Sequence, residues 1–163
     1  MVGFVKNLNP TKKMRLPVPP VIVASLLAAL LILYLSGWRP IGTLIDDTWR
    51  LMPALLLFAG GAITVVSTAR RFARNDSQIN TFKKPRNLVT DGLFAYTRNP
   101  IYLGFTLLLL GAAVAANSVV ALFAPIAFFV MADRHYIPFE EKTAEETFGD
   151  PSLNYTTRVR RWL

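Results

Sequence analysis

Residues 101–132 read IYLGFTLLLLGAAVAANSVVALFAPIAFFVMA, and this stretch decides the fold class. It holds two apolar runs, 101–116 and 119–132, which are separated only by Asn117 and Ser118. This spacing predicts a tight hairpin of two helices. Because neither run carries a charged side chain, the hairpin suits the hydrocarbon of a membrane.

Two further apolar runs lie upstream of the hairpin, at 18–38 and 51–69. Each approaches the roughly 20 residues that a helix needs to cross a bilayer, and their few polar side chains are Ser, Thr and Tyr. The apolar content of 53% and the mean hydropathy of +0.38 agree with this reading. We expect an all-α integral membrane protein, a single membrane domain over 1–163. Its four transmembrane helices are predicted at about 18–38, 51–69, 101–116 and 119–132.

The first run could alternatively be a secretory signal, because Lys12, Lys13 and Arg15 precede it. Its length exceeds the roughly 15 residues of a signal's apolar region, and no small-x-small cleavage site precedes Trp38. These two observations favour an uncleaved span.

The basic residues behind the net charge of +8 cluster in particular segments between the apolar runs and beside them. Basic residues gather before the first run, between the second and third, and after the fourth, whereas only Arg39 and Arg50 lie between the first and second. With four spans, the positive-inside rule places the N- and C-termini in the cytoplasm. Attraction to anionic lipid head groups then accounts for the basic excess without any nucleic-acid partner.

The composition argues against a metal site. The chain has no cysteine, which excludes thiolate ligands and disulfides, and its single histidine, His135, cannot form a multi-histidine site. We therefore expect no metal.

The predicted cytoplasmic loop, about 70–99, is long for so small a membrane protein, which favours a functional role. Thr90-Asp91-Gly92 predicts a turn. Asn99 then predicts a helix N-cap and Pro100 the first helical position of the third span. The free N–H groups of such a helix end suit a carboxylate or phosphate.

The segment after the fourth span is polar. Pro138 predicts a new helix that carries Glu140 and Glu141 in its opening turns and ends near Phe148, and residues 153–163 predict an interfacial helix. We expect both helices at the cytoplasmic membrane surface. Taken separately, these features have simple structural explanations: the acids favour the helix dipole, the late arginines anchor to head groups, and Gly60, Gly61, Gly104 and Gly111 serve helix packing.

Taken together, two motifs resemble the isoprenylcysteine carboxyl methyltransferase and phospholipid methyltransferase superfamily. The first is residues 88–104, LVTDGLFAYTRNPIYLG, similar to the family's Gly-x-x-x-Tyr followed by Arg-His-Pro-x-Tyr-x-Gly. The second runs from Glu140-Glu141 through Phe148-Gly149 to Tyr155, Arg158 and Arg161-Trp162. The resemblance covers about 81–163. It departs from the family at Asn99, where many members have His, and at Ser152, where the usual residue is Tyr.

The resemblance implies a methyltransferase that uses S-adenosylmethionine as methyl donor, bound within residues 81–163 at the cytoplasmic membrane surface. It implies a lipidic or prenylated, membrane-partitioned acceptor, and leaves a carboxylate or an amine open. Glu141, Tyr155 and Arg158 are the candidate catalytic residues, with Arg158 orienting the acceptor. Phe94 is a further candidate for adenine contact. The candidate donor-binding residues are Tyr96, Arg98, Asn99, Pro100, Tyr102, Gly104, Glu140 and Glu141.

Two alternatives stay open on the sequence. A small four-span transporter or assembly subunit without catalysis would be expected to carry an ionisable residue inside a span, and none lies within the four apolar runs. A family member that binds the donor without turnover would be consistent with the departures at Asn99 and Ser152. The short chain suggests a prokaryotic inner-membrane protein.

Overall fold

The structure is a computed structural model that describes residues 17–38, 41–74 and 87–163. The basic leader, Arg39 and the basic residues within 75–86 lie outside the described residues. The described residues form helices and connecting turns with no strand, as the all-α prediction requires.

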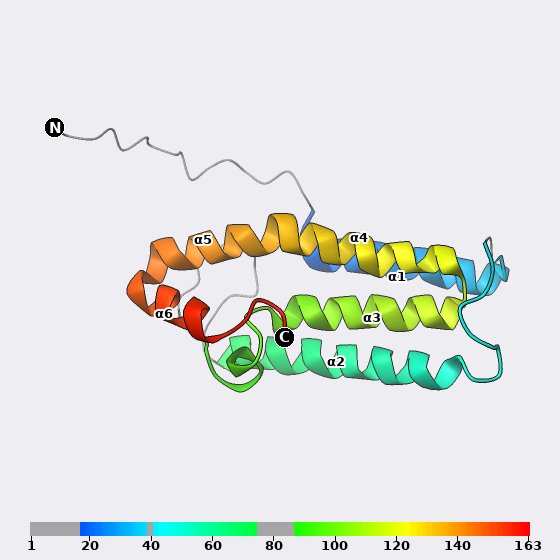
Figure 1. The fold of residues 1–163 in the computed structure, drawn as a ribbon, viewed down its shortest axis with the longest axis horizontal. Coiled ribbons are helices and arrows are strands. Elements are labelled where there is room, and N and C mark those ends of the chain that lie inside the picture. Colours follow the sequence, from blue (N-terminus) through cyan, green and yellow to red (C-terminus); the bar gives the residue numbers. More distant parts are fainter. Residues whose placement is uncertain (1–16, 39–40, 75–86) are drawn as a thin grey trace.

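Three of the helices are long and apolar enough to cross a membrane. They are α1 (Pro19–Ser36), α2 (Leu51–Arg74) and a continuous helical rod over Val119–Phe148. α3 (Pro100–Ala116) is a shorter apolar helix of 17 residues, about 26 Å long at the usual rise per residue. It lies between α2 on one side and α1 and α4 on the other (Figure 1). The chain is therefore an integral membrane helical bundle.

Glycines on both helices bring α2 and α3 into close contact. A Cβ added to Gly61 would lie 2.7 Å from the carbonyl oxygen of Gly104, and one added to Gly111 would lie 2.7 Å from the backbone nitrogen of Phe58. Because backbone atoms cannot move aside like flexible side chains, these positions require small residues. The packing role expected for Gly61, Gly104 and Gly111 is confirmed. The same expectation is wrong for Gly60, because a Cβ there would meet no atom of the described residues within 4 Å.

The helical hairpin turns at Asn117, as predicted. Asn117 adopts the left-handed conformation (φ 51°) that ends α3, and its buried amide holds the connection between α1 and α2. Its Oδ1 accepts hydrogen bonds from the backbone nitrogens of Leu44 and Ile45, at 2.9 and 3.0 Å. One side chain therefore fixes both connections at this end of the bundle.

The helix expected to restart at Pro138 instead continues from the fourth apolar run. The 3-10 turn η2 (Val119–Leu122), α4 (Phe123–Met131), the π turn η3 (Ala132–Tyr136) and α5 (Ile137–Phe148) follow without a break. A π turn inserts one extra residue, so the missing N–H and the ring of Pro138 are accommodated without ending the helix. The sequence prediction missed this turn because periodicity does not reveal it.

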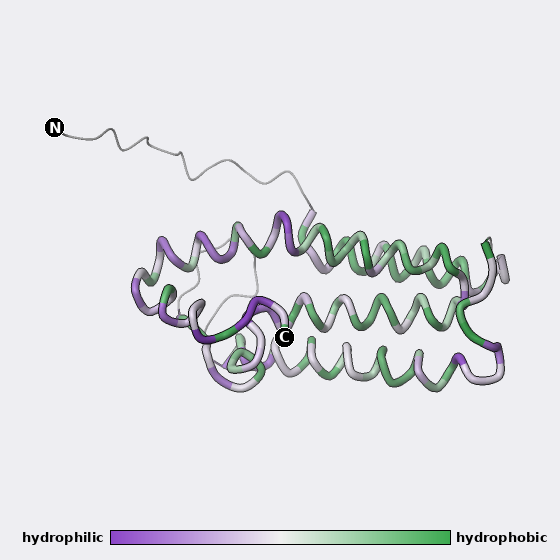
Figure 2. Tube along the Cα trace, viewed as in Figure 1, coloured by the Kyte–Doolittle hydropathy of each residue, from purple (hydrophilic) through white to green (hydrophobic). Residues whose placement is uncertain are grey.

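The polar part of the chain extends beyond the apolar bundle at one end. α5 and α6 (Asp150–Arg158) are hydrophilic, whereas α1, α3 and α4 are strongly apolar (Figure 2). α5 ends at Phe148, as predicted, with Gly149 at φ 60° between the two helices. The C-terminus returns from α6 to the start of α3 (Figure 1).

Candidate active site

The start of α3 and the acidic pair on α5 meet at the polar end of the bundle. The hydroxyl of Tyr102 donates to Glu140 Oε1 at 2.8 Å, and Arg98 Nη1 lies 3.1 Å from Glu141 Oε1. Tyr102 is fully buried beneath this contact, where its ring stacks on that of Tyr136 with centroids 6.2 Å apart. The convergence of these two segments, on which the enzyme interpretation depends, is confirmed.

The last five residues, 159–163, form a non-helical segment that we call the C-terminal strap. Its backbone binds the residues before α3: the backbone nitrogen of Arg98 donates to the Arg160 carbonyl at 2.9 Å. Thr97 Oγ1 and Asn99 Nδ2 both donate to the Arg161 carbonyl, at 3.2 and 2.9 Å.

The expectation of one interfacial helix over 153–163 is therefore wrong beyond Arg158. Val159 is extended (φ −116°, ψ 134°) at the end of α6. The Arg160 and Arg161 carbonyls bond to the 97–99 segment in place of continuing a helical ladder.

Arg161 connects two carboxylates within the site. Its Nε and Nη2 donate to the two oxygens of Glu141, at 3.2 and 2.6 Å, and its Nη1 donates to Asp133 at 3.3 Å. The hydrogen bonds that Arg161 donates to Glu141 raise the pKa of its guanidinium, which therefore stays charged. A fork of this kind fixes the orientation of both side chains. Head-group anchoring alone does not describe this arginine.

Trp162 completes the attachment of the strap. Its indole Nε1 donates to Asp133 Oδ1 at 3.0 Å, and its ring stacks on Phe129 of α4 with centroids 4.5 Å apart. Asp133 lies in the π turn, a feature often found at functional sites. The sequence predicted only head-group anchoring for Arg161, and no role for Asp133 or Trp162. The Arg161-Trp162 pair within the family motif was the signal available for them.

Arg98 has one N–H group that makes no hydrogen bond to the described residues. Its side chain is 16% exposed, and its Nε is buried without a hydrogen-bond partner among the described residues. Buried guanidinium N–H groups are costly to leave unpaired, so this one suits an additional anionic or carbonyl group.

Tyr155 occupies a second small core beside the site, with Val89 and Phe94. Its hydroxyl donates to the Phe94 carbonyl at 2.7 Å, and burial raises the pKa of Tyr155 to about 12. The phenol therefore stays protonated at neutral pH and ties α6 to the 3-10 turn η1 (Gly92–Ala95). Its catalytic role remains a prediction.

The turn predicted at 90–92 connects that small core to α2. Asp91 pairs with Arg71 of α2, and Gly92 has a φ of 62°. The positive φ requires glycine here, whereas the Arg71 guanidinium, which a Cβ on Gly92 would approach to 2.6 Å, belongs to a flexible side chain that can move aside. The ring of Phe94 packs edge-on against Phe72, with centroids 5.3 Å apart.

The remaining predicted site residues lie around the cluster without contacting the acidic pair. Arg158 is exposed and its Nε donates to the Asn154 carbonyl of its own helix. Tyr96 is 75% exposed, Pro100 is buried as the first residue of α3, and Gly104 faces α2. Their roles in binding or catalysis remain predictions.

A family model described as phospholipid methyltransferase matches residues 49–151. The chain belongs to this family. The match includes Arg98, Tyr102 and the acidic pair, and it ends before Arg158 and the strap. No curated protein and no solved structure matched the chain. This phospholipid methyltransferase family lies in the superfamily that the two motifs indicated, and it suggests methyl transfer to a lipid-type substrate.

Proposed function

We propose that the protein is an S-adenosylmethionine-dependent methyltransferase whose acceptor is a lipid or another membrane-partitioned carboxylate or amine. The proposal rests on a group of contacts, which we call the junction, at the polar end of the apolar bundle. In the junction Tyr102 donates a hydrogen bond to Glu140, and Glu141 pairs with both Arg98 and Arg161. A soluble donor and a lipidic acceptor could both reach such a position, one from water and one from the bilayer.

The residues of the junction fit the donor's polar groups. S-adenosylmethionine carries a carboxylate, an ammonium, ribose hydroxyls and a sulfonium, and it supplies an electrophilic methyl group when bound. The unpaired Nε of Arg98 suits the carboxylate. Glu140, oriented by Tyr102, suits the ammonium or the ribose hydroxyls. Asn99, Pro100, Tyr96 and Gly104 complete the proposed donor-binding set.

Glu141 has a different role in this proposal. Both of its oxygens already bond to guanidinium groups, so a donor ammonium would have to compete with two arginines. We assign Glu141 to holding Arg98 and Arg161 in place, so that the donor meets a preformed site. Alignment and water exclusion are the main contributions a protein can make to an in-line displacement.

The acceptor side of the proposal rests on Arg158 and Tyr155. Arg158 is exposed at the end of α6, where it could orient an anionic acceptor. A carboxylate acceptor is already nucleophilic at neutral pH. An amine acceptor must lose a proton, and Glu140 is a candidate base for it.

We also propose a topology of four spans with both termini in the cytoplasm, in a prokaryotic inner membrane. The site end of the described bundle carries Arg70, Arg71 and Arg74 on α2 and the arginines of α6 and the strap, whereas Arg50 lies at the opposite end. The positive-inside rule then puts the site and helices α5 and α6 at the inner membrane surface.

Transfer of label in reconstituted vesicles tests the proposal. Protein in phospholipid vesicles is incubated with methyl-labelled S-adenosylmethionine, and the lipid extract is analysed for label. We expect labelled lipid with the wild type, and at least a tenfold loss with Glu141→Gln. Glu145→Gln, an exposed acid one turn further along α5, is the matched control and should retain activity.

Arg158→Ala distinguishes donor binding from acceptor orientation. We expect it to keep donor binding, measured by calorimetry, and to lose transfer. Wild-type protein that binds no donor, or a Glu141→Gln variant as active as the Glu145→Gln control, would contradict the proposal. Tight donor binding with no labelled lipid would instead support binding without turnover.

A further inference from the structure

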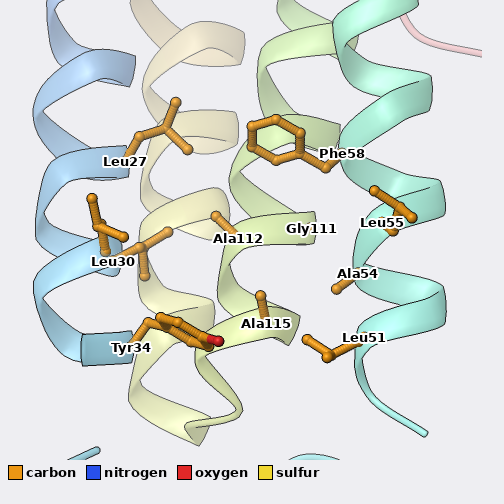
Figure 3. Close-up of a pocket in the computed structure, with 11 residues that line it drawn as sticks. Leu27, Leu30, Tyr34, Leu51, Ala54, Leu55, Phe58, Gly111, Ala112 and Ala115 are labelled. Atoms are coloured by element: carbon orange, nitrogen blue, oxygen red, sulfur yellow. The ribbon is translucent and has the colours of Figure 1, made fainter. Parts of the chain in front are cut away.

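A groove of about 560 Å³ lies at the end of the bundle opposite the candidate active site. It runs between α1 and α2, and α3 forms its floor (Figure 3). Leucines of α1 and α2 form its walls, and Gly111, Ala112 and Ala115 form the floor. Its size falls within the roughly 300–1,000 Å³ of small-molecule sites.

The groove exists because α3 has only small side chains here. α1 and α2 both pack on α3, yet Gly111, Ala112 and Ala115 cannot fill the space between them. Its wall residues include Leu31 and Leu55, which are 56% and 69% exposed. An apolar space of this kind excludes water, and left empty it would lose the dispersion contacts of its walls. Within a bilayer, the acyl chains of lipids are available to fill this space.

A cation lies at one end of the groove. The guanidinium of Arg50 sits 5.7 Å from the ring centroid of Tyr34, and its Nη1 donates to the Ala115 carbonyl at 2.9 Å. Tyr34 and Ala115 both line the groove, so the charge stands at its mouth. Exposed Trp38 and Trp49, on the same connection as Arg50, are the residue type that marks the membrane interface. The mouth therefore lies at head-group depth.

Arg50 can accept a further anionic partner. Its Nε pairs with Asp47 at 3.2 Å and its Nη1 with Ala115, whereas Nη2 has no hydrogen bond to any described residue. A phosphate approaching from the Nη2 side would gain a charge-assisted hydrogen bond. The groove thus combines an apolar space that could hold one lipid acyl chain with a cation that could bind the lipid's head group.

We propose that this groove binds one acyl chain of an anionic glycerophospholipid, whose phosphate meets Arg50. The site is separate from the methyl-transfer site, since its floor lies about three turns along α3 from Tyr102. The bound lipid fills the space between α1 and α2 and acts as a structural ligand of the bundle.

Native mass spectrometry of the full chain tests the proposal, with phosphatidylglycerol and phosphatidylcholine of identical chains as probes. The wild type should retain one phosphatidylglycerol per chain in preference to phosphatidylcholine. Ala112→Phe, which fills the floor, should reduce retention at least tenfold. Ala29→Phe, on an exposed part of α1 outside the groove, is the matched control and should retain the lipid.

The head-group half of the proposal is tested at Arg50. Arg50→Gln should abolish the preference for phosphatidylglycerol, and Arg50→Lys should keep it. A wild type that retains neither lipid, or equal retention by Ala112→Phe and Ala29→Phe, would overturn the proposal. So would a wild-type dimer that Ala112→Phe dissociates, because a second copy would then be the occupant. Methyl transfer by Ala112→Phe should stay at the wild-type level, which separates this test from that of the active site.

Discussion

Tyr102→Phe isolates one hydrogen bond of the candidate active site. The change removes only the hydroxyl that donates to Glu140 Oε1 at 2.8 Å. The ring, which is 1% exposed, keeps its packing against Tyr136 and Phe128, with centroids 6.2 and 6.4 Å away. A hydrogen bond to a charged group contributes about 1.5–3 kcal/mol. This bond is present before the donor binds, so its free energy is an upper bound on the loss of donor binding. Because each 1.4 kcal/mol corresponds to about a tenfold change in affinity, the dissociation constant for S-adenosylmethionine should rise by at most about 100-fold.

Tyr136→Phe is the matched control for this variant. Tyr136 is equally buried in the same stack, but its hydroxyl donates to the Pro17 carbonyl, away from the acidic pair. Both variants lose a buried hydrogen bond, so both melting temperatures should fall, and only Tyr102→Phe should bind the donor more weakly. Calorimetric titration and thermal unfolding in the same detergent make the comparison. Equal donor affinity in the two variants would refute the assignment of Glu140 to the donor site.

Two further predictions concern the scaffold. Gly111→Ala should destabilise the bundle by about 1–3 kcal/mol, because its new methyl group would lie 2.7 Å from the backbone nitrogen of Phe58. Gly60→Ala, whose methyl group would meet no atom within 4 Å, should cost little in the same thermal unfolding assay. Tyr155→Phe should cost about 1 kcal/mol through its lost bond to the Phe94 carbonyl. Because burial raises the pKa of Tyr155 from 10.0 to about 12, the unfolded chain releases this proton first, so wild-type stability should fall above about pH 10. Unfolding midpoints across pH 8–11 that fall equally in Tyr155→Phe would contradict this assignment.

The helices and their ends were largely predictable because their causes are local. Apolar runs specify the spans, Pro100 specifies the first residue of α3, and Asn117 specifies the hairpin turn. The π turn was not predictable in this way, because it arises from how the helix passes Pro138. α2 also continues five residues beyond the predicted end at 69, to Arg74, since its arginines lie beyond the apolar run.

The candidate site was predictable in part, through the family motifs. They named Arg98, Tyr102 and the acidic pair, which the structure brings together. The strap was missed because its contacts join residues more than 60 positions apart through backbone carbonyls, which no side-chain pattern records.

The strap changes how the departure at Asn99 is interpreted. Asn99 is 6% exposed, and its amide Nδ2 donates to the Arg161 carbonyl at 2.9 Å. That contact needs a side-chain N–H of suitable reach, which an amide supplies as well as an imidazole does. Proton exchange by a titrating ring has no part in it. Asn in place of His therefore preserves the attachment of the strap, which holds Arg161 against Glu141. The departure at Asn99 therefore has a structural role of its own, and donor binding without turnover stays an alternative to be tested.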